Sequence, residues 1–213
     1  MVKIRILSGR SDYEALSYFT EFWPSDNTDP IERLFIQWGF SQVFPAKTMC
    51  AHVTTWNKNS SVKFRTDVAM MCKLGFDIKL ADMSKDDETY CRTAVQNYNR
   101  LKPVVLEGDM YRLVSPYGSN HTSTMYVGKD KDKAVVFAFD IHPRYAEKTL
   151  PVRLQGLDAD KMYRVKEINL MPGANSSLSG NGEVFSGEFL MNVGLNLFTT
   201  QQLNSRVVEV VAE

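Results

Sequence analysis

The chain has 213 residues, of which 44% are hydrophobic and 23% are charged, as in an average globular protein. Its 25 Lys and Arg residues balance 25 Asp and Glu residues, which argues against nucleic acid or an anionic membrane as the main partner. No apolar run approaches the roughly 20 residues that span a bilayer, and no signal-peptide pattern opens the chain. We therefore expect a cytoplasmic location.

The first half of the chain predicts alternating strands and helices. Asp29 and Pro30 suit the cap and first position of one helix, and Ser84 suits the cap of another, which Pro103 is expected to end. The alternation predicts parallel βα units. The expected strands are residues 2–7, 21–23 and 48–53, and the expected helices begin at residues 11, 30, 67 and 84.

The second half of the chain predicts strands separated by turn-forming clusters. Several of these strands alternate apolar and polar residues, which indicates an antiparallel β-sandwich. The boundary between the halves falls between Pro103 and Gly118. The expected strands are residues 134–139, 151–154, 162–168 and 206–211.

Cysteine and histidine give no sign of a metal site. The three cysteines have no close spacing and are interpreted as buried thiols, and the three histidines are scattered. Dinucleotide, phosphate-loop and serine-triad motifs are also missing from the sequence. We expect neither a metal nor a cofactor.

The densest polar stretch is residues 23–29, between an expected strand and an expected helix. One interpretation is structural: Asp29 caps the helix and the preceding polar residues form a turn. The other is a sugar site, in which Trp23 gives a stacking wall and raises the pKa of the Asp26 carboxyl toward general-acid duty. Asp67 is interpreted as a member of a buried ion pair rather than as a catalytic group.

The sequence resembles the C-terminal part of the bacterial α-galactosidase (melibiase) family, glycoside hydrolase family 36. The most specific motif is W-x-S-D-N-T-D from Trp23 to Asp29, together with the helix that follows. The matching stretches are residues 9–13, 15–16, 22–39, 45–47, 51–53, 63–65, 67–70, 74–77, 108–113, 115–117, 187–188 and 190–195.

This resemblance implies a fold of class α/β plus all-β. Residues 1–107 would form the last units of a (β/α)8 catalytic barrel, and residues 108–213 an antiparallel β-sandwich domain. It also implies retaining hydrolysis of terminal α-galactosyl residues in melibiose- or raffinose-type sugars. Asp26 would be the acid/base, and Gly9, Arg10, Trp23 and Asp26 would contact the substrate.

The chain also departs from the family pattern. The family nucleophile lies in a K-W-D motif, and no Trp-Asp pair occurs in this sequence. In the C-x-x-G-G-G-R sugar loop, Ile4 stands at the Cys position, and Leu7 and Ser8 stand at two Gly positions, where side chains block close approach of a sugar.

We therefore expect a truncated α-galactosidase that is inactive alone. The alternative is a non-catalytic carbohydrate-binding or partner module that complements another polypeptide carrying the missing strands. Because a half barrel leaves sheet edges uncovered, homo-oligomerisation is also an option.

Overall fold

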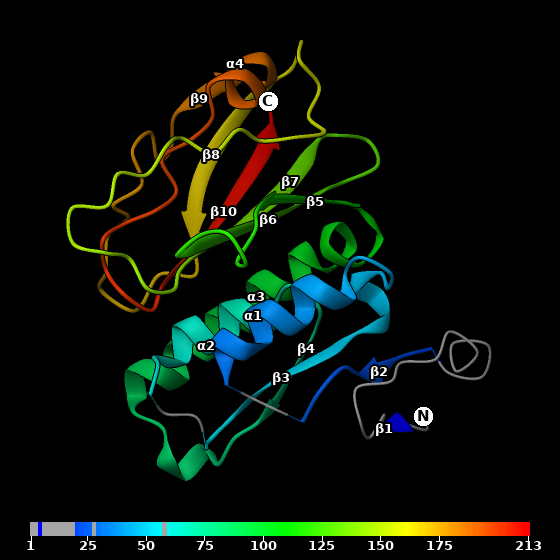
Figure 1. Ribbon diagram of the computed structural model, residues 1–213, viewed down its shortest axis with the longest axis vertical. Coiled ribbons are helices and arrows are strands. Elements are labelled where there is room, and N and C mark those ends of the chain that lie inside the picture. The colour runs from blue at the N-terminus through cyan, green and yellow to red at the C-terminus, as the bar shows by residue number, and fades with distance from the viewer. Residues whose placement is uncertain (1–3, 6–19, 27–28, 57–58) are drawn as a thin grey trace.

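The computed structural model describes residues 4–5, 20–26, 29–56 and 59–213, and places them in successive layers (Figure 1). Short parallel strands form the first layer, three helices the second, and an antiparallel sheet the third. Irregular segments and a short helix cover the far face of that sheet. The described helices include none long and apolar enough to cross a membrane.

The parallel strands follow one another in chain order. They are β1 (Ile4–Arg5), β2 (Phe22–Trp23), β3 (Cys50–Thr54) and β4 (Lys73–Asp77). β1 pairs with β2, β3 pairs with β4, and a single parallel bridge from Phe22 to Met49 joins the two pairs. The intervening helices make these βα units, as the alternating sequence pattern predicts.

The helices are α1 (Pro30–Phe40), α2 (Val62–Ala69) and α3 (Lys85–Glu107). The predicted cap of α1 is confirmed, because Asp29 Oδ1 accepts hydrogen bonds from the Ile31 and Glu32 amides at 3.0 Å. The predicted cap of α3 is also confirmed, because Ser84 Oγ accepts from the Asp87 amide at 3.1 Å. Each side chain satisfies amides that the helix itself leaves unpaired.

Two helix predictions are wrong in their limits. The helix expected to begin at residue 67 lies at Val62–Ala69 and is capped by Ser61. Lys73–Asp77 is a strand paired with β3. The periodicity of a short apolar run does not show whether the run is a helix or a strand. Pro103 does not end α3, which continues to Glu107. Pro103 lies on the exposed side of the helix, while Val104 and Val105 beyond it are buried.

The antiparallel sheet has six strands in the order β5-β6-β7-β10-β8-β9, and every pairing in it is antiparallel. The prediction of an antiparallel second half is thus confirmed, and the sheet fits a β-sandwich domain. The strands are β5 (Asp109–Val114), β6 (His121–Val127), β7 (Lys133–Asp140), β8 (Met162–Ile168), β9 (Val184–Ser186) and β10 (Asn204–Ala212).

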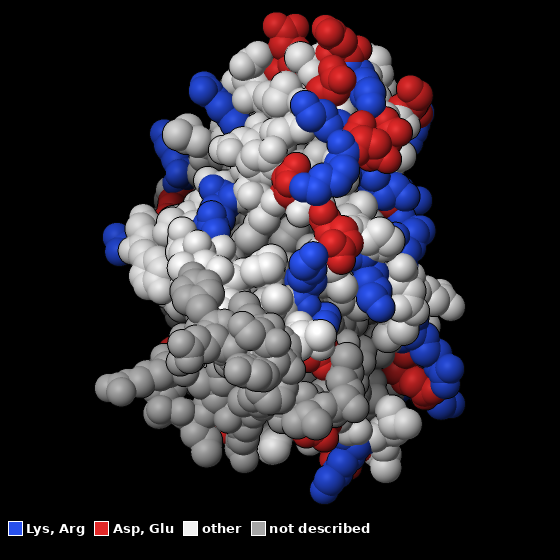
Figure 2. Space-filling model, turned by 90° about the vertical axis from the view of Figure 1, so that its right-hand side faces the viewer, with Lys and Arg blue, Asp and Glu red and all other residues white. Residues whose placement is uncertain are grey.

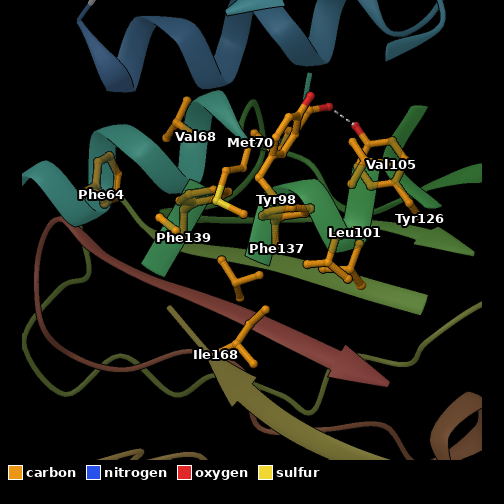
Figure 3. Packing of buried hydrophobic residues seen from close by; sticks show 14 of the residues in the cluster. Phe64, Val68, Met70, Tyr98, Leu101, Val105, Tyr126, Phe137, Phe139 and Ile168 are labelled. Atoms are coloured by element: carbon orange, nitrogen blue, oxygen red, sulfur yellow. Dashed lines mark hydrogen bonds between the residues drawn. The ribbon is translucent and has the colours of Figure 1, made fainter. Parts of the chain in front are cut away.

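The strands β6, β7 and β10 of this sheet are buried on both faces. On β7, Val135, Phe137 and Phe139 contact the helices (Figure 3), and the alternate residues contact the opposite cover. That cover includes α4 (Gly187–Asn192) and Val152, which forms a single bridge with Leu195. The strand expected at residues 151–154 is therefore wrong, because the chain pairs there at one residue only.

A buried network joins the helices to the sheet. The Asp67 carboxylate, which is fully buried, accepts hydrogen bonds from Lys63 Nζ at 2.6 Å and Tyr90 Oη at 2.8 Å. It also accepts from Asn169 Nδ2 at 3.0 Å and Ser205 Oγ at 2.7 Å. The predicted buried ion pair of Asp67 is confirmed, with Lys63 as its partner.

The three thiols are expected to react slowly in the folded chain. Cys50, Cys72 and Cys91 are free and buried, and burial raises the pKa of Cys72 to about 12 and that of Cys91 to about 11. Because the thiolate is the nucleophile, folding keeps Cys72 and Cys91 in their unreactive thiol form at pH 8, and burial shields Cys50 from the reagent. Titration with a disulfide reagent should detect all three thiols only after denaturation. Rapid labelling of the native chain would contradict this prediction.

Candidate functional site

The polar loop predicted as a sugar site connects the carboxyl end of β2 to the start of α1. Neighbouring residues on a strand point to opposite faces. Phe22 therefore packs with Ala51 and Val53 in the core toward the helices, whereas Trp23 lies half-buried on the other side. The Trp23 ring lies 5.0 Å from the His52 ring, at an interplanar angle of 55°. Trp23 and His52 thus lie together beside the loop that carries Asp26.

Asp26 itself is exposed and follows β2 by three residues. A loop in this position, after a parallel strand, is where catalytic residues are placed in α/β folds. Asp26 does not line either of the cavities that adjoin β3 and β4. Gly9 and Arg10, the other expected substrate contacts, lie outside the described residues.

Arg33 of α1 holds this loop through a hydrogen bond to its backbone, a role that the sequence analysis did not predict. Its side chain is 3% exposed, and its Nη2 donates to the Ser25 carbonyl at 3.3 Å and lies 3.5 Å from His52 Nδ1. Burial lowers the pKa of the Arg33 guanidinium, and the nearby Asp26 carboxylate acts in the opposite direction. No local spacing indicates these contacts, because Ser25 precedes α1 and His52 follows it in the sequence.

A cavity of about 360 Å³ opens beside the first residues of β3 and β4. Its walls include Glu21, Trp23, His52 and Lys73, and Lys73 Nζ donates to Glu21 Oε2 at 2.7 Å. A second cavity of about 260 Å³ lies at the carboxyl ends of these strands and includes Thr54, Arg65 and Asp82. The first cavity also includes Tyr98 of α3, and the second includes Arg65 of α2, so strand and helix residues line both cavities together.

Comparison with known families accounts for both halves of the chain. Residues 7–108 match the family model described as Melibiase, and residues 121–210 match the model described as Glycosyl hydrolase family 36 C-terminal domain. The two halves of the chain are therefore similar to the melibiase family and to the C-terminal domain of glycoside hydrolase family 36, respectively. The resemblance inferred from the Trp23–Asp29 motif is thereby confirmed.

The family relatives are much longer than this chain. Alpha-galactosidase 2 of Hypocrea jecorina is 35% identical over 206 residues, which are 94% of this chain but 26% of the relative. The solved GH36 α-galactosidase AgaB of Geobacillus stearothermophilus has a TM-score of 0.81 and 28% identity, over 93% of this chain and 26% of its own. The chain spans about a quarter of the length of the curated relatives that it matches.

A further solved structure carries a ligand. A variant of AgaA from the same bacterium, crystallised with raffinose, has a TM-score of 0.81 and 27% identity, and covers 93% of this chain and 27% of its own. This similarity extends over the helical and the antiparallel part of the chain alike.

Proposed function

We propose that this chain supplies the acid/base part of a retaining α-galactosidase site, with Asp26 as the acid/base. The W-x-S-D-N-T-D motif, located in a loop at the carboxyl end of a parallel strand, carries the proposal. In this mechanism Asp26 protonates the departing glycosidic oxygen and then removes a proton from the attacking water. The second carboxylate, about 5–5.5 Å away in such enzymes, attacks the anomeric carbon.

The neighbouring side chains have supporting roles in this proposal. Trp23 offers a flat ring on which a sugar can stack, and Gly9 and Arg10 contact the galactosyl unit. Arg33 positions the loop through the Ser25 carbonyl and keeps a positive charge near Asp26. The substrates are terminal α-galactosides of the raffinose type, a class supported by the raffinose complex of AgaA.

The domain assignment belongs to the same proposal. Residues 1–107 are the last units of a (β/α)8 barrel, and residues 108–213 form the C-terminal β-sandwich. The parallel pairing among β1 to β4, and the position of the described helices α1, α2 and α3 on one side of these strands, support the first part. The two family matches lie on either side of this boundary apart from a single residue, which supports the division.

The 213 residues contain no family nucleophile motif, so we infer that the remaining catalytic groups come from chain outside this sequence. The chain covers about a quarter of the length of its relatives, which favours a second role of the same kind, as a module that another polypeptide completes. Charges of both signs are interspersed over the described surface in Figure 2 and form no basic field there. A nucleic-acid role finds no support on that face.

A polypeptide of these 213 residues alone is expected to release no measurable aryl group from an aryl α-galactoside. Protonation without a nucleophile leaves the harder half of the reaction uncatalysed. The measurement is turnover of the purified chain, with folding checked by circular dichroism. Robust turnover that disappears in the Asp26→Asn variant would overturn the proposed inactivity and place all catalytic groups within this sequence.

A further inference from the structure

The side-chain amide of Gln37 is buried and has no hydrogen-bond partner in the part of the chain that the structure describes. Gln37 lies on the inner face of α1 and is 4% exposed. Both Nε2 and Oε1 are buried, and neither atom is hydrogen-bonded to a described residue. A buried polar atom without a partner carries the full cost of its lost hydration, so native proteins rarely leave one unpaired. Two such atoms on one amide indicate a partner that is not a protein group.

A small cavity adjoins this amide, between the helical layer and the antiparallel sheet. Its volume is about 10 Å³, close to the least that holds one water molecule. Gln37 comes to the lining from α1, Met110 from β5, and Thr124 and Tyr126 from β6. The cavity therefore lies where the first half of the chain packs on the second.

The lining of this cavity is polar but uncharged. The described residues around it offer amide, hydroxyl, indole, thiol, thioether and hydrocarbon groups, and no acidic or basic side chain. The Cys72 thiol in this lining is protonated at neutral pH, because burial raises its pKa to about 12. A charged ligand would lie here without a counter-charge, at a high cost in lost hydration. The occupant that fits is neutral and no larger than a water molecule.

Hydroxyl groups of β6 offer such a molecule further hydrogen bonds. Tyr126 Oη donates to the Met71 carbonyl at 2.7 Å, so its own lone pairs remain able to accept. Thr124, which is 5% exposed, adds a hydroxyl that can donate or accept. Because water also donates and accepts, it suits either orientation of the Gln37 amide. The amide and these hydroxyls together supply the two to four polar partners typical of buried water.

We propose that this cavity binds a single structural water molecule, which joins the Gln37 amide of α1 to a β6 hydroxyl group, that of Thr124 or Tyr126. The water is a hydrogen-bonded link between the helical layer and the antiparallel sheet. It fixes the side of α1 that faces the sheet, and it does not depend on the function proposed for the Asp26 loop.

The direct test is a high-resolution crystal structure of the 213-residue chain. We expect a water oxygen within about 3.2 Å of the Gln37 amide and of Thr124 Oγ1 or Tyr126 Oη. A structure in which both atoms of the Gln37 amide bond directly to protein groups would overturn the proposal. So would a cavity without any density peak.

Oxygen-17 relaxation dispersion tests the proposal in solution, because it counts long-lived internal water molecules. Gln37→Met keeps the length of the side chain but removes both polar atoms, so it should lower the count by one. Gln42→Met makes the same change at an exposed position just after α1 and, as the matched control, should leave the count unchanged. An equal count in the parent and the folded Gln37→Met variant would refute the proposal. If Gln37→Met does not fold, the crystal structure of the parent decides alone.

Discussion

The Asp26→Asn substitution is expected to lower kcat by about 10²–10⁴-fold in a chimaera that contains the missing half of the site. In this chimaera, residues 20–213 replace the matching C-terminal part of AgaB, which covers 26% of that enzyme. The graft begins at residue 20, so that the segment that holds Ile4, Leu7 and Ser8 in this chain comes from AgaB. The amide cannot donate the proton that the departing oxygen needs, and so the loss should be largest for poor leaving groups.

Asp29→Asn is the matched control for this substitution. Asp29 lies in the same loop and undergoes the same chemical change, but its carboxylate caps α1, and Asn is an equally good cap. Its kcat should therefore stay within a few-fold of the parent chimaera. Rates would be measured with aryl α-galactosides of graded leaving-group pKa. Equal rates for the parent and the Asp26→Asn chimaera, for every leaving group, would remove Asp26 from the acid/base role.

The capped helices and the antiparallel strands could be predicted from the sequence because their signals are local. Asp29 and Ser84 bond to amides within three residues of themselves, and β8 has the bounds that its alternating pattern predicts. Lys73–Asp77 was misread because its strand state depends on pairing with β3, which no local pattern encodes. Pro103 was misread because burial of the residues beyond it outweighs one lost hydrogen bond.

The same distinction holds for the functional residues. The Asp26 loop is a contiguous motif and could be found in the sequence. Arg33 was missed because its importance comes from contact with Ser25 and His52, across the β2–α1 and α1–β3 connections. The cavity beside Gln37 brings together residues from 34 to 139, and a lone glutamine in a sequence gives no indication of such a convergence. The buried network of Asp67 likewise joins residues 63 to 205, although its ion pair could be predicted from a local spacing.

Asp67→Ala is expected to lower the free energy of unfolding by about 3–5 kcal/mol, the largest stability effect of any substitution considered. The carboxylate is fully buried and accepts from four side chains of α2, α3, the segment after β8, and β10. Its removal leaves the Lys63 ammonium, 12% exposed, without its counter-charge. Urea unfolding followed by fluorescence and circular dichroism would measure the change. Asp86→Ala, at an exposed position on α3, should cost less than about 1 kcal/mol.

The destabilisation caused by the unpaired Lys63 charge can be distinguished from that caused by the lost side-chain volume. Replacing both charges, in Lys63→Met with Asp67→Leu, removes the buried unpaired ammonium and should recover part of the stability lost in Asp67→Ala. The recovery should be incomplete, because Tyr90 and Ser205 still lose an acceptor. A double variant less stable than Asp67→Ala would show that packing, and not the uncompensated charge, dominates the cost. The network connects the helical layer to the antiparallel sheet. If Asp67 is the main link between the two halves, Asp67→Ala should also make the fluorescence and circular dichroism transitions fall at different urea concentrations.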